Sequence, residues 1–485
     1  MKNKKPRFTS LALVPVALAL CSAATSVSSC TAEFEVRCPD GTEQTAGGGD
    51  VNKACGPAAG AGGAAGQGGG PGGNAGQGGT SGGPQGGNGG EGGQPLVCAG
   101  EDRACDRACV DVRVSNQHCG ECNKACSGTC QAGACVPVTQ LALGGSHSCA
   151  LLKDGTTKCW GNNNAGQLGD GELSLQLRPT KVETSKAFNH IAAGHENTCG
   201  ITTAKKLECW GSNEFSQTSV PQLASFVAVE SLALGRRHSC AIAKTDAQTF
   251  RLAYCWGILG SLGTDNSASN FSQVVGVTGG DDPSRLASGD NFSCALGDLG
   301  GNGGSIECWG RNNKGQLCSG NLQDAGEAVT SLGAAERFVA ITAGAAHGCA
   351  FTEGGQLFCW GDNSRGQTGD QAASPKVDKG SQPTLESVSD VSAGYDHTCA
   401  IQNGGELFCW GANGSGQIGD GTTDDRLLPT KVKGLPASAI EVKGGGEHTC
   451  ARLEDESVYC WGKNDRGQLG DGTTENRSVP PRVAF

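Results

Sequence analysis

Aromatic and methionine side chains are scarce in this sequence. Its 485 residues include one Met, 7 Trp, 3 Tyr and 13 Phe, against 81 Gly. Such a composition is typical of chains that are rich in turns and short β-strands rather than in long helices. An apolar run near the N-terminus, within residues 11–20, is too short and too closely flanked by small residues to be a membrane-spanning helix.

Clusters of basic residues are also missing. The segment 1–29 contains four of the 37 Lys and Arg side chains and no acid, so the rest of the chain carries 33 basic against 48 acidic side chains. Beyond the N-terminal head, no Lys/Arg cluster is longer than two or three residues. Because a phosphate-binding surface needs a basic patch, we expect no nucleic-acid partner.

Residue combinations that are typical of enzymes are missing as well. The sequence has no nucleophile paired with a base, no unique pair of carboxylates and no cofactor fingerprint outside its glycine-rich segment. The string "HENTC", from His195, lacks the second histidine of a zinc-protease helix. We predict a protein that is not an enzyme and that has neither a metal site nor a cofactor.

The N-terminus predicts export. Residues 1–29 combine a basic head, a short apolar run and a region of small residues, as a signal peptide does. The end of this segment, Val27-Ser28-Ser29-Cys30, resembles the lipobox of bacterial lipoproteins, in which the cysteine is acylated. We therefore expect lipidation at Cys30 and attachment to the cell envelope, at the outer membrane or cell surface, through this lipid alone. Ordinary signal cleavage near Ser26 is the alternative.

Residues 30–97 form a predicted lipid-anchored segment and linker. Glycine occupies more than half of positions 56–95, which carry a single charge, so this stretch cannot bury a core. It is expected to act as a flexible tether.

Residues 98–135 contain eight cysteines in 38 positions. In an exported chain, so dense a set indicates a small module held by disulfides. A zinc site built from Cys119, Cys122, Cys126 and Cys130 is the alternative. The pattern "ACVDVRVSNQHCGEC" followed by "CQAGAC" resembles the stigma-specific type of cysteine motif found in some secreted proteins.

One phrase recurs between residues 137 and 485. "CWGKNDRGQLGDGTT", from Cys460, returns as "CWGANGSGQIGDGTT" from Cys409 and "CWGNNNAGQLGDG" from Cys159, and all seven Trp residues follow such a cysteine. A second cysteine precedes each phrase, at successive intervals of 50, 41, 54, 55, 50 and 51 residues. Short strands and glycine turns at this period predict an all-β, seven-bladed β-propeller. Since a catalytic group occurs once, we interpret the recurring polar residues as scaffold.

The two halves of the repeat identify a family. Gly-x-x-His-(Ser/Thr)-Cys-Ala, followed by Trp-Gly-x-Asn-x-x-Gly-Gln-(Leu/Ile)-Gly-Asp-Gly, resembles the repeat of the regulator of chromosome condensation, a seven-bladed propeller. The resemblance implies ring closure, with the final "VPPRVAF" completing the blade that "VTQLALGG" begins. Nuclear members act on a small GTPase or bind chromatin, partners that an exported acidic chain would not meet, so no small GTPase is expected. Secreted members include inhibitors that bind β-lactamases.

Cysteine spacing predicts one disulfide in each blade. In five repeats the second cysteine follows the first by ten residues, and a three-residue hairpin loop such as Lys153-Asp154-Gly155 then places the two cysteines opposite each other. Longer loops allow the same pairing in the other two repeats. The predicted pairs are Cys149–Cys159, Cys199–Cys209, Cys240–Cys255, Cys294–Cys308, Cys349–Cys359, Cys399–Cys409 and Cys450–Cys460. Buried pairs of free cysteines are the alternative. Cys318 falls outside this scheme, at a turn position where clearer repeats have glycine and where we expect a positive φ.

A histidine precedes the first cysteine by two positions in five repeats, as His147, His238, His347, His397 and His448. The resemblance implies that each supports its own blade through a local hydrogen bond. A ring of imidazoles that binds a metal or an anion is the alternative.

These features predict an exported, lipid-anchored cell-surface protein whose propeller binds a protein or an envelope glycan. The alternatives are a secreted hydrolase or lyase with an active site on the propeller face, and a purely structural envelope protein. Repeats three and four have lengthened hairpins, and Phe250 and Arg251 are the predicted partner contacts because exposed aromatic and Arg groups anchor interfaces. Loop drift without function is the alternative for these hairpins.

Overall fold

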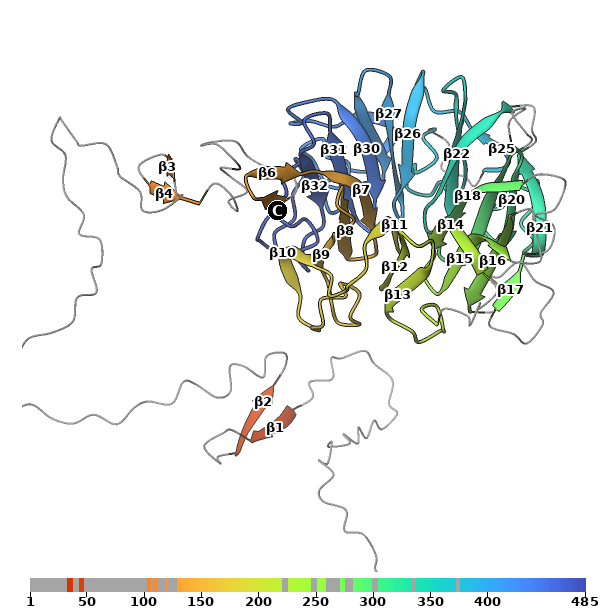
Figure 1. Cartoon of the computed structure of the whole chain (residues 1–485). Helices are drawn as coiled ribbons and strands as arrows, with labels where there is room; N and C mark the ends of the chain where they lie inside the picture. Colours follow the sequence, from red (N-terminus) through yellow and green to blue (C-terminus); the bar gives the residue numbers. More distant parts are fainter. Residues whose placement is uncertain are drawn as a thin grey trace, which may run out of the picture. The chain divides into compact units, whose positions relative to one another are not determined.

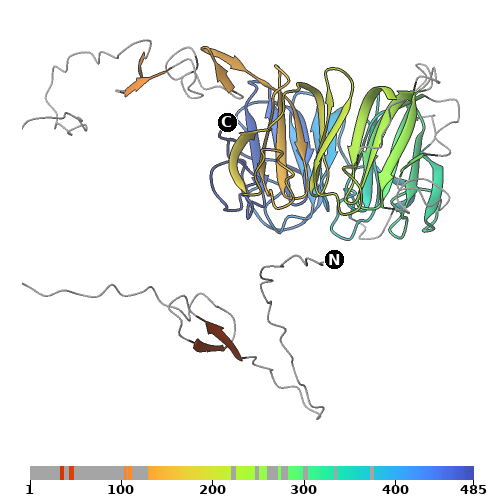
Figure 2. The same ribbon diagram turned by 60° about the horizontal axis from the view of Figure 1, so that its bottom comes forward.

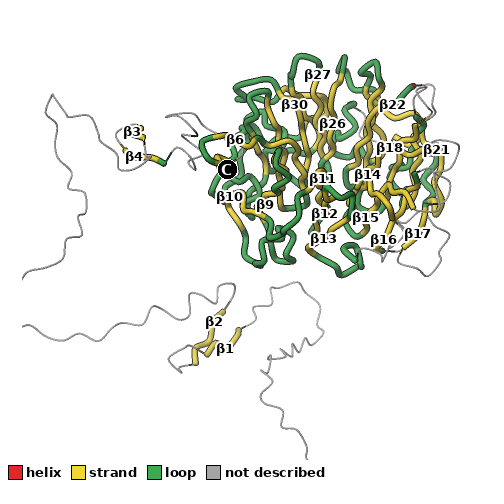
Figure 3. The backbone as a smooth tube through the Cα atoms, in the orientation of Figure 1, coloured by secondary structure: helices red, strands yellow, loops and turns green. Residues whose placement is uncertain are grey.

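The computed structural model describes residues 33–37, 43–47, 103–105, 108–111, 119, 129–219, 226–245, 251–258, 271–274, 282–298, 304–332, 336–371 and 376–485. The chain divides into two units, residues 1–90 and 91–485. In the first unit, β1 (Glu33–Arg37) and β2 (Glu43–Gly47) pair as an antiparallel hairpin. The described elements of both units are strands joined by loops and turns (Figure 3).

Two short hairpins precede the repeats. Strand β3 (Arg103–Cys105) pairs with β4 (Ala108–Val110), and β5 (Thr129–Gln131) pairs with β6 (Ala134–Val136). Cys119 and Cys130 form a disulfide with Cα atoms 5.5 Å apart. Two of the four cysteines that were considered as zinc ligands are therefore bonded to each other.

Seven antiparallel sheets follow as the blades of a propeller (Figures 1 and 2). Within each blade the strands follow one another in sequence order from the inner strand outward. Blade 1 contains β7 (Val138–Leu143), β8 (His147–Leu152), β9 (Thr157–Gly161) and β10 (Gln176–Lys181), and blade 2 contains β11 (Phe188–Ala193), β12 (Asn197–Thr202) and β13 (Leu207–Gly211). Blade 3 contains β14 (Phe226–Leu234), β15 (His238–Thr245), β16 (Leu252–Gly257) and β17 (Phe271–Gln273), and blade 4 contains β18 (Asp282–Ser288), β19 (Phe292–Asp298), β20 (Ile306–Gly310) and β21 (Ala325–Leu332).

The last three blades repeat the arrangement. Blade 5 contains β22 (Phe338–Ala343), β23 (His347–Thr352), β24 (Leu357–Gly361) and β25 (Lys376–Ser381), and blade 6 contains β26 (Val388–Ala393), β27 (His397–Gln402), β28 (Leu407–Gly411) and β29 (Arg426–Lys431). Blade 7 contains β30 (Ala439–Gly444), β31 (His448–Leu453) and β32 (Val458–Gly462). The all-β, seven-bladed fold predicted from the repeat period is confirmed.

The C-terminal segment closes the ring differently from the expectation. Arg477 and Arg482 bridge to Gly462 and Tyr459 of β32, so this segment is the outer edge of blade 7 rather than a strand of blade 1. Blade 1 has its own fourth strand, β10, and leaves no place for it. The C-terminal segment still contributes to closure, because the ring of Phe485 contacts Trp160 of blade 1 edge to face at 5.8 Å.

All seven predicted blade disulfides are present. In each, the two cysteines face one another on the second and third strands, with Cα atoms 4.0–4.1 Å apart. The turn predicted in blade 1 is also confirmed, since Leu152 N donates to Thr156 O at 2.8 Å. The pairing survives the longer hairpins of blades 3 and 4, where Cys240 and Cys294 face Cys255 and Cys308.

The core lies between neighbouring blades as well as within them. Val138 and Leu141 of blade 1, for example, pack in one buried cluster with Val458, Leu469 and Val483 of blade 7. Such shared clusters exclude water from the blade interfaces and stabilise the ring through burial of apolar surface.

Candidate functional site

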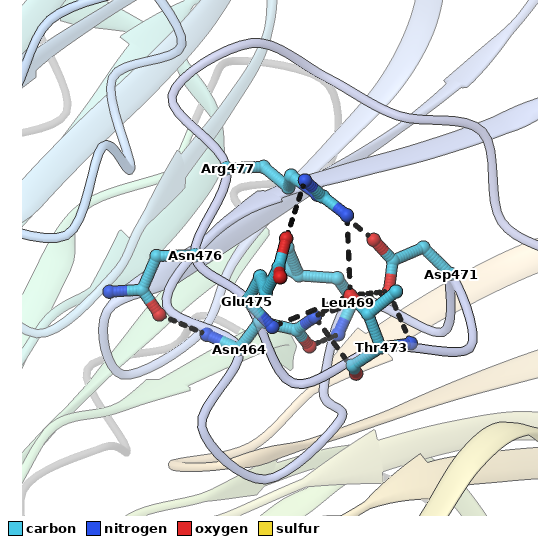
Figure 4. A network of polar contacts seen from close by, with 7 residues as sticks. All are labelled: Asn464, Leu469, Asp471, Thr473, Glu475, Asn476 and Arg477. Atoms are coloured by element: carbon cyan, nitrogen blue, oxygen red, sulfur yellow. Dashed lines mark hydrogen bonds and ion pairs between the residues drawn. The ribbon is translucent and has the colours of Figure 1, made fainter.

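The recurring Asn-rich loops make turn contacts. In the last repeat, Asn464 donates through Nδ2 to Asp471 and to Thr473 O, while its Oδ1 accepts from Leu469 N (Figure 4). Arg477 donates to the second carboxylate oxygen of Asp471 at 3.1 Å. The polar groups that resembled a site in the sequence are therefore satisfied inside the loop, as expected for scaffold.

The recurring Gln joins each loop to the next blade. The indole N–H of the tryptophan in the next blade donates to the backbone carbonyl of this Gln. The pairs are Trp160 to Gln468, Trp210 to Gln167, Trp256 to Gln217, Trp360 to Gln316, Trp410 to Gln367 and Trp461 to Gln417. These distances lie between 2.8 and 3.1 Å. Among the described residues, no acceptor lies within hydrogen-bond distance of Trp309 Nε1, whose preceding loop belongs to the decayed third repeat.

The recurring histidines also join neighbouring blades. His147 Nε2 lies 2.9 Å from Thr198 Oγ1 of blade 2, and that hydroxyl donates its own hydrogen to Gln167 O. The imidazole Nε2 must then be the donor. The same contact pairs His238 with Ser293, His347 with Thr398, His397 with Thr449 and His448 with Ser148. The prediction of a hydrogen bond within each histidine's own blade is wrong, because the hydroxyl partner belongs to the next blade.

Burial keeps these imidazoles neutral. All five are fully buried, and burial lowers the pKa of His147, His397 and His448 to about 3 and that of His238 and His347 to about 4. Two blades lack the histidine. Blade 2 has Asn197 in that position, and blade 4 has Phe292, whose partner position in blade 5 is Gly348, with no side-chain hydroxyl. Across the described ranges, no three His, Cys, Asp or Glu side chains converge as metal ligands would.

The residues that differ between repeats gather at one mouth of the central channel. Each comes directly after the glycine that follows an inner strand: Gly145, His195, Arg236, Asp290, Ala345, Tyr395 and Gly446. Backbone bonds link most of them around the ring, from Gly145 N to His195 O, Asp290 N to Ala345 O, Ala345 N to Tyr395 O, Tyr395 N to Gly446 O and Gly446 N to Gly144 O. The rim is therefore held in place by the backbone while its side chains differ.

Two aromatic rings meet over the channel. His195 of blade 2 and Tyr395 of blade 6 stack with centroids 5.7 Å apart and planes inclined by 9°. In a ring of seven, these blades are as far apart as two blades can be. Gly145 and Gly446 lie between them, and a Cβ at Gly145 would be only 2.9 Å from the Tyr395 hydroxyl. The glycines of blades 7 and 1 thus leave the space that the two rings fill.

A charged pair completes the mouth. Arg236 Nη1 lies 3.4 Å from Asp290 Oδ2 on the adjacent blade. Burial raises the pKa of Asp290 and Arg236 opposes that shift, while burial and then Arg236 lower the pKa of His195. Burial also raises the pKa of Tyr395, so both stacked rings are uncharged near neutral pH. The Tyr395 hydroxyl oxygen is buried and has no hydrogen-bond partner among the described residues.

Beneath the mouth, the channel contains a cavity of about 340 Å³ lined by the inner strands of all seven blades. At its far end lie Gln140, His190, Arg285 and Lys443. Gln140 there contacts His190 Nδ1 at 3.1 Å, and burial followed by Lys443 lowers the pKa of His190 to about 4. The cavity thus has aromatic and charged groups at one end, and two cationic side chains, Arg285 and Lys443, at the other.

Family models cover the propeller. The RCC1-like domain matches residues 220–485, more than half of the chain, and two models of the regulator of chromosome condensation (RCC1) repeat match residues 138–167 and 154–201. The chain belongs to the RCC1-like domain family. The resemblance seen in the repeat sequence is thereby confirmed.

Relatives of this RCC1-like chain are named for regulatory roles. It is 28% identical to the ultraviolet-B receptor UVR8 of Arabidopsis thaliana, over 71% of this chain and 69% of that one. It is 37% identical to the X-linked retinitis pigmentosa GTPase regulator of Homo sapiens, over 52% of this chain but only 24% of the relative. The crystal structure of human WBSCR16 superposes with a TM-score of 0.60 at 19% identity, covering 68% of this chain and 94% of that one, which supports the fold.

Of the two partner contacts predicted from sequence, the described one, Arg251, lies away from the channel mouth. Phe250 is outside the described residues. Arg251 directly precedes β16 of blade 3, and its Nη1 lies 3.7 Å from Glu230 Oε2 of the same blade. The hairpins between second and third strands open on the face opposite the His195 and Tyr395 turns, because successive turns of a meander alternate between its two ends. The roles of Phe250 and Arg251 remain predictions.

Sequence reasoning missed His195 and Tyr395 as a pair. Their signal was present, since the two positions after an invariant glycine vary between the repeats while that glycine stays fixed. Cys30 lies outside the described residues, so its lipidation also stays a prediction. No helix among the described residues has the length and apolar character needed to cross a bilayer.

Proposed function

We propose that this RCC1-like propeller is an exported, lipid-anchored binding module that recognises a protein or an envelope glycan at the channel mouth of His195, Arg236, Asp290 and Tyr395. One observation carries the proposal: the residues shared by the repeats are used for contacts between blades, whereas the mouth residues differ from blade to blade on a fixed backbone rim. A rigid scaffold that presents varied side chains is suited to selective binding.

The chemistry of the mouth favours binding over catalysis. Stacked neutral rings offer an apolar face to a ligand, and the Arg236–Asp290 pair offers a donor and an acceptor at its side. Aromatic and Arg side chains of this kind dominate binding energy at interfaces. The relatives' names describe a receptor and a GTPase regulator, which agrees with a module that works through binding.

Export and anchoring rest on residues 1–30 alone. The signal-like segment and the Val27-Ser28-Ser29-Cys30 lipobox support attachment to a bacterial cell envelope. A glycine-rich tether would then hold the propeller clear of the membrane. We expect no small GTPase as partner because export separates the chain from cytosolic proteins, and this expectation fails if the export signal does.

Site-specific photo-crosslinking tests the binding face. A photoreactive residue in place of Tyr395 should give a saturable adduct on intact cells, and excess unlabelled protein should compete it away. The matched control places the same residue at Leu173, which is exposed on the loop between β9 and β10 of blade 1. Equal adducts from both positions, or none from position 395, would contradict the proposal.

Anchoring is tested separately. Mass spectrometry of purified protein should find an acylated N-terminal cysteine, and Cys30→Ser should move the protein into soluble fractions. Wild-type protein that is soluble and begins near Val27 would leave the binding face untouched but would remove the lipid anchor from the proposal.

A further inference from the structure

The inner strand of each blade turns one edge toward the central channel. Alternate residues of an antiparallel strand bond to the neighbouring strand, and the residues between them point their N–H and C=O groups away from it. In blade 1, Leu141 N donates to the Glu441 carboxylate of blade 7 at 3.1 Å. In blade 2, Ile191 N donates to Gln140 Oε1 of blade 1, also at 3.1 Å. A side chain from the preceding blade thus satisfies a backbone group that faces the channel.

This capping contact is missing from the wall formed by blades 3, 4 and 5. The equivalent residues there are Leu232, Leu286 and Ile341. Among the described residues, no side chain bonds to their backbone N–H groups. Backbone groups inside a protein need hydrogen-bond partners. This wall of the cavity is therefore left for water or a ligand to satisfy.

At the far end of the cavity, Gln140 fixes the tautomer of His190. Its Nε2 donates to Ile191 O at 3.0 Å, and the second hydrogen of this Nε2 is directed at His190 Nδ1, 3.1 Å away. Because Nδ1 is the acceptor, the proton of the neutral imidazole is on Nε2. His190 lines the cavity, and no described residue accepts a hydrogen bond from its Nε2. The imidazole thus offers an N–H donor to a molecule in the channel.

Lys443 brings a positive charge to the same place. Burial and then the charge of Lys443 lower the pKa of His190, so the ammonium group lies near the imidazole. Lys443 Nζ is 3.8 Å from Glu441 Oε1, which is too far for a hydrogen bond. The Glu441 carboxylate is bonded instead to Leu141 N and to Arg452 Nε, at 3.1 and 3.0 Å. The hydrogen-bond donors of Lys443 are therefore not used by any described residue.

Arg285 of blade 4 adds a second cation. It is exposed, so this end of the channel opens to solvent, and it forms no ion pair with a described residue. Asp390, the acid at the equivalent position of blade 6, accepts a hydrogen bond from Val442 N at 3.0 Å. Of the described residues that line the cavity, only Asp290 is acidic, and it lies beside Arg236 at the opposite mouth. The far end therefore has positive charge and unused donors, without a carboxylate in its wall.

We propose that the far end of the channel binds a small organic anion, whose carboxylate or phosphate group is held by Lys443, Arg285 and the Nε2–H of His190. The oxygens of such groups are hydrogen-bond acceptors, and their bonds to charged donors are stronger than bonds between neutral groups. The cavity of about 340 Å³ has room for the neutral part of the molecule, whose hydroxyl groups would bond to the open wall of blades 3 to 5. This site lies at the other end of the channel from His195 and Tyr395, so either site can be lost without the other.

Three sugars of similar size serve as probes: glucuronate, glucose-6-phosphate and uncharged glucose. Isothermal titration calorimetry with the full, disulfide-intact chain should show saturable binding of at least one of the two anions, and binding of glucose that is weaker by about tenfold or more. Binding of glucuronate alone assigns a carboxylate ligand, and binding of glucose-6-phosphate alone assigns a phosphate ligand. If neither anion binds saturably, or if glucose binds as tightly, the proposal is overturned.

Removal of a single charge tests the location. Lys443→Gln should weaken binding of the anion by about tenfold or more. Lys433→Gln is the matched control, because it removes the same charge from the exposed connection between blades 6 and 7, outside the channel lining. It should leave the affinity unchanged. Equal losses in the two variants would show that the anion responds only to the net charge of the protein, and would refute a site in the channel.

The imidazole of His190 reports directly on the site. A bound anion should raise the pKa of His190 by about one pH unit, because its negative charge offsets that of Lys443. Lys443→Gln should raise the same pKa without any ligand. His195, at the opposite mouth, is the internal control in both NMR titrations, and its pKa should not change. An anion that shifts the pKa of His195 but not that of His190 would bind at the mouth, and this result would also overturn the proposal.

Discussion

His147 of blade 1 and Thr198 of blade 2 share a buried hydrogen bond of 2.9 Å between Nε2 and Oγ1, and four other blade boundaries repeat it. Nε2 of His147 is the donor in this bond, and burial keeps the imidazoles of the set neutral by lowering the pKa of each histidine. The ring is thus held together at its interior by groups that respond to pH.

As the pH falls, the histidines should destabilise the fold before the carboxylates become protonated. The five histidines have pKa values of about 3 to 4 when folded, against about 6.5 when unfolded, so the unfolded chain binds more protons between these values. Stability is then complete above about pH 6.5 and falls as the pH drops toward 4, by roughly 1–2 kcal/mol per histidine at pH 5. Urea denaturation of disulfide-intact protein at pH 7.5 and pH 5 measures it.

The control for this pH effect comes from the chain itself, because blade 2 has Asn197 in the histidine position. His347→Asn should reduce the loss of stability between pH 7.5 and 5 by about a fifth. A free energy of unfolding that is flat across this range would show that the imidazoles are not buried as described.

Glycine at the loop turn is required by two constraints at once. Gly419 has φ +77°, and a Cβ there would lie 2.6 Å from Trp461 Nε1, whose bond to Gln417 O joins blades 6 and 7. Gly419→Ala should cost about 2–4 kcal/mol, from backbone strain and the displaced indole. Gly404→Ala is the control, since Gly404 has φ +95° with no neighbour within 4 Å and should cost only about 1 kcal/mol. Equal costs in thermal denaturation would refute the steric argument.

The same turn position shows which structural features could be predicted by comparing the repeats with one another. Cys318 occupies it in blade 4 with φ 51°, as predicted from the glycines of the clearer repeats. Blade number, hairpin register and all seven disulfides were also predictable, because each depends on residues close together in the chain. Ring closure by "VPPRVAF" and the partner of each histidine were predicted wrongly. Both depend on contacts between blades, and the period of the repeat does not indicate which neighbouring blade supplies the partner.

The candidate binding mouth could not be derived from spacing. His195 and Tyr395 stack only because the ring brings blades 2 and 6 to a common axis and because blades 7 and 1 have glycine between them. Residue spacing within one repeat predicts contacts between residues close in the chain, whereas the contact of His195 with Tyr395 depends on the positions of four blades. Positions that vary within a fixed motif were the accessible clue.

The two tryptophans Trp309 and Trp410 should differ in their response to truncation of the indole N–H. Trp410 Nε1 donates to Gln367 O at 3.1 Å, whereas Trp309 Nε1 has no acceptor among the described residues. Trp410→Phe removes a buried bond and leaves Gln367 O with one partner fewer, but Trp309→Phe removes a buried polar group that makes no bond to any described residue. The first should cost about 1–2 kcal/mol more in unfolding free energy than the second. Equal losses would place an acceptor beside Trp309.

Removal of the Tyr395 ring should free His195 without unfolding the ring of blades. Burial and Arg236 lower the pKa of His195, and the tyrosine ring stacked at 5.7 Å supplies part of that burial. Tyr395→Ala should therefore raise the His195 pKa toward its usual 6.5, as measured by NMR titration of the imidazole Cε1–H signal. Tyr395→Phe keeps the stacked face and should leave the His195 pKa close to that of the wild type. His190, at the far end of the channel, is the internal control, and its pKa should stay at about 4 in both variants. If His195 titrates identically in all three proteins, the two rings do not cover one another in solution, and the channel mouth is not the closed aromatic surface on which the binding proposal depends.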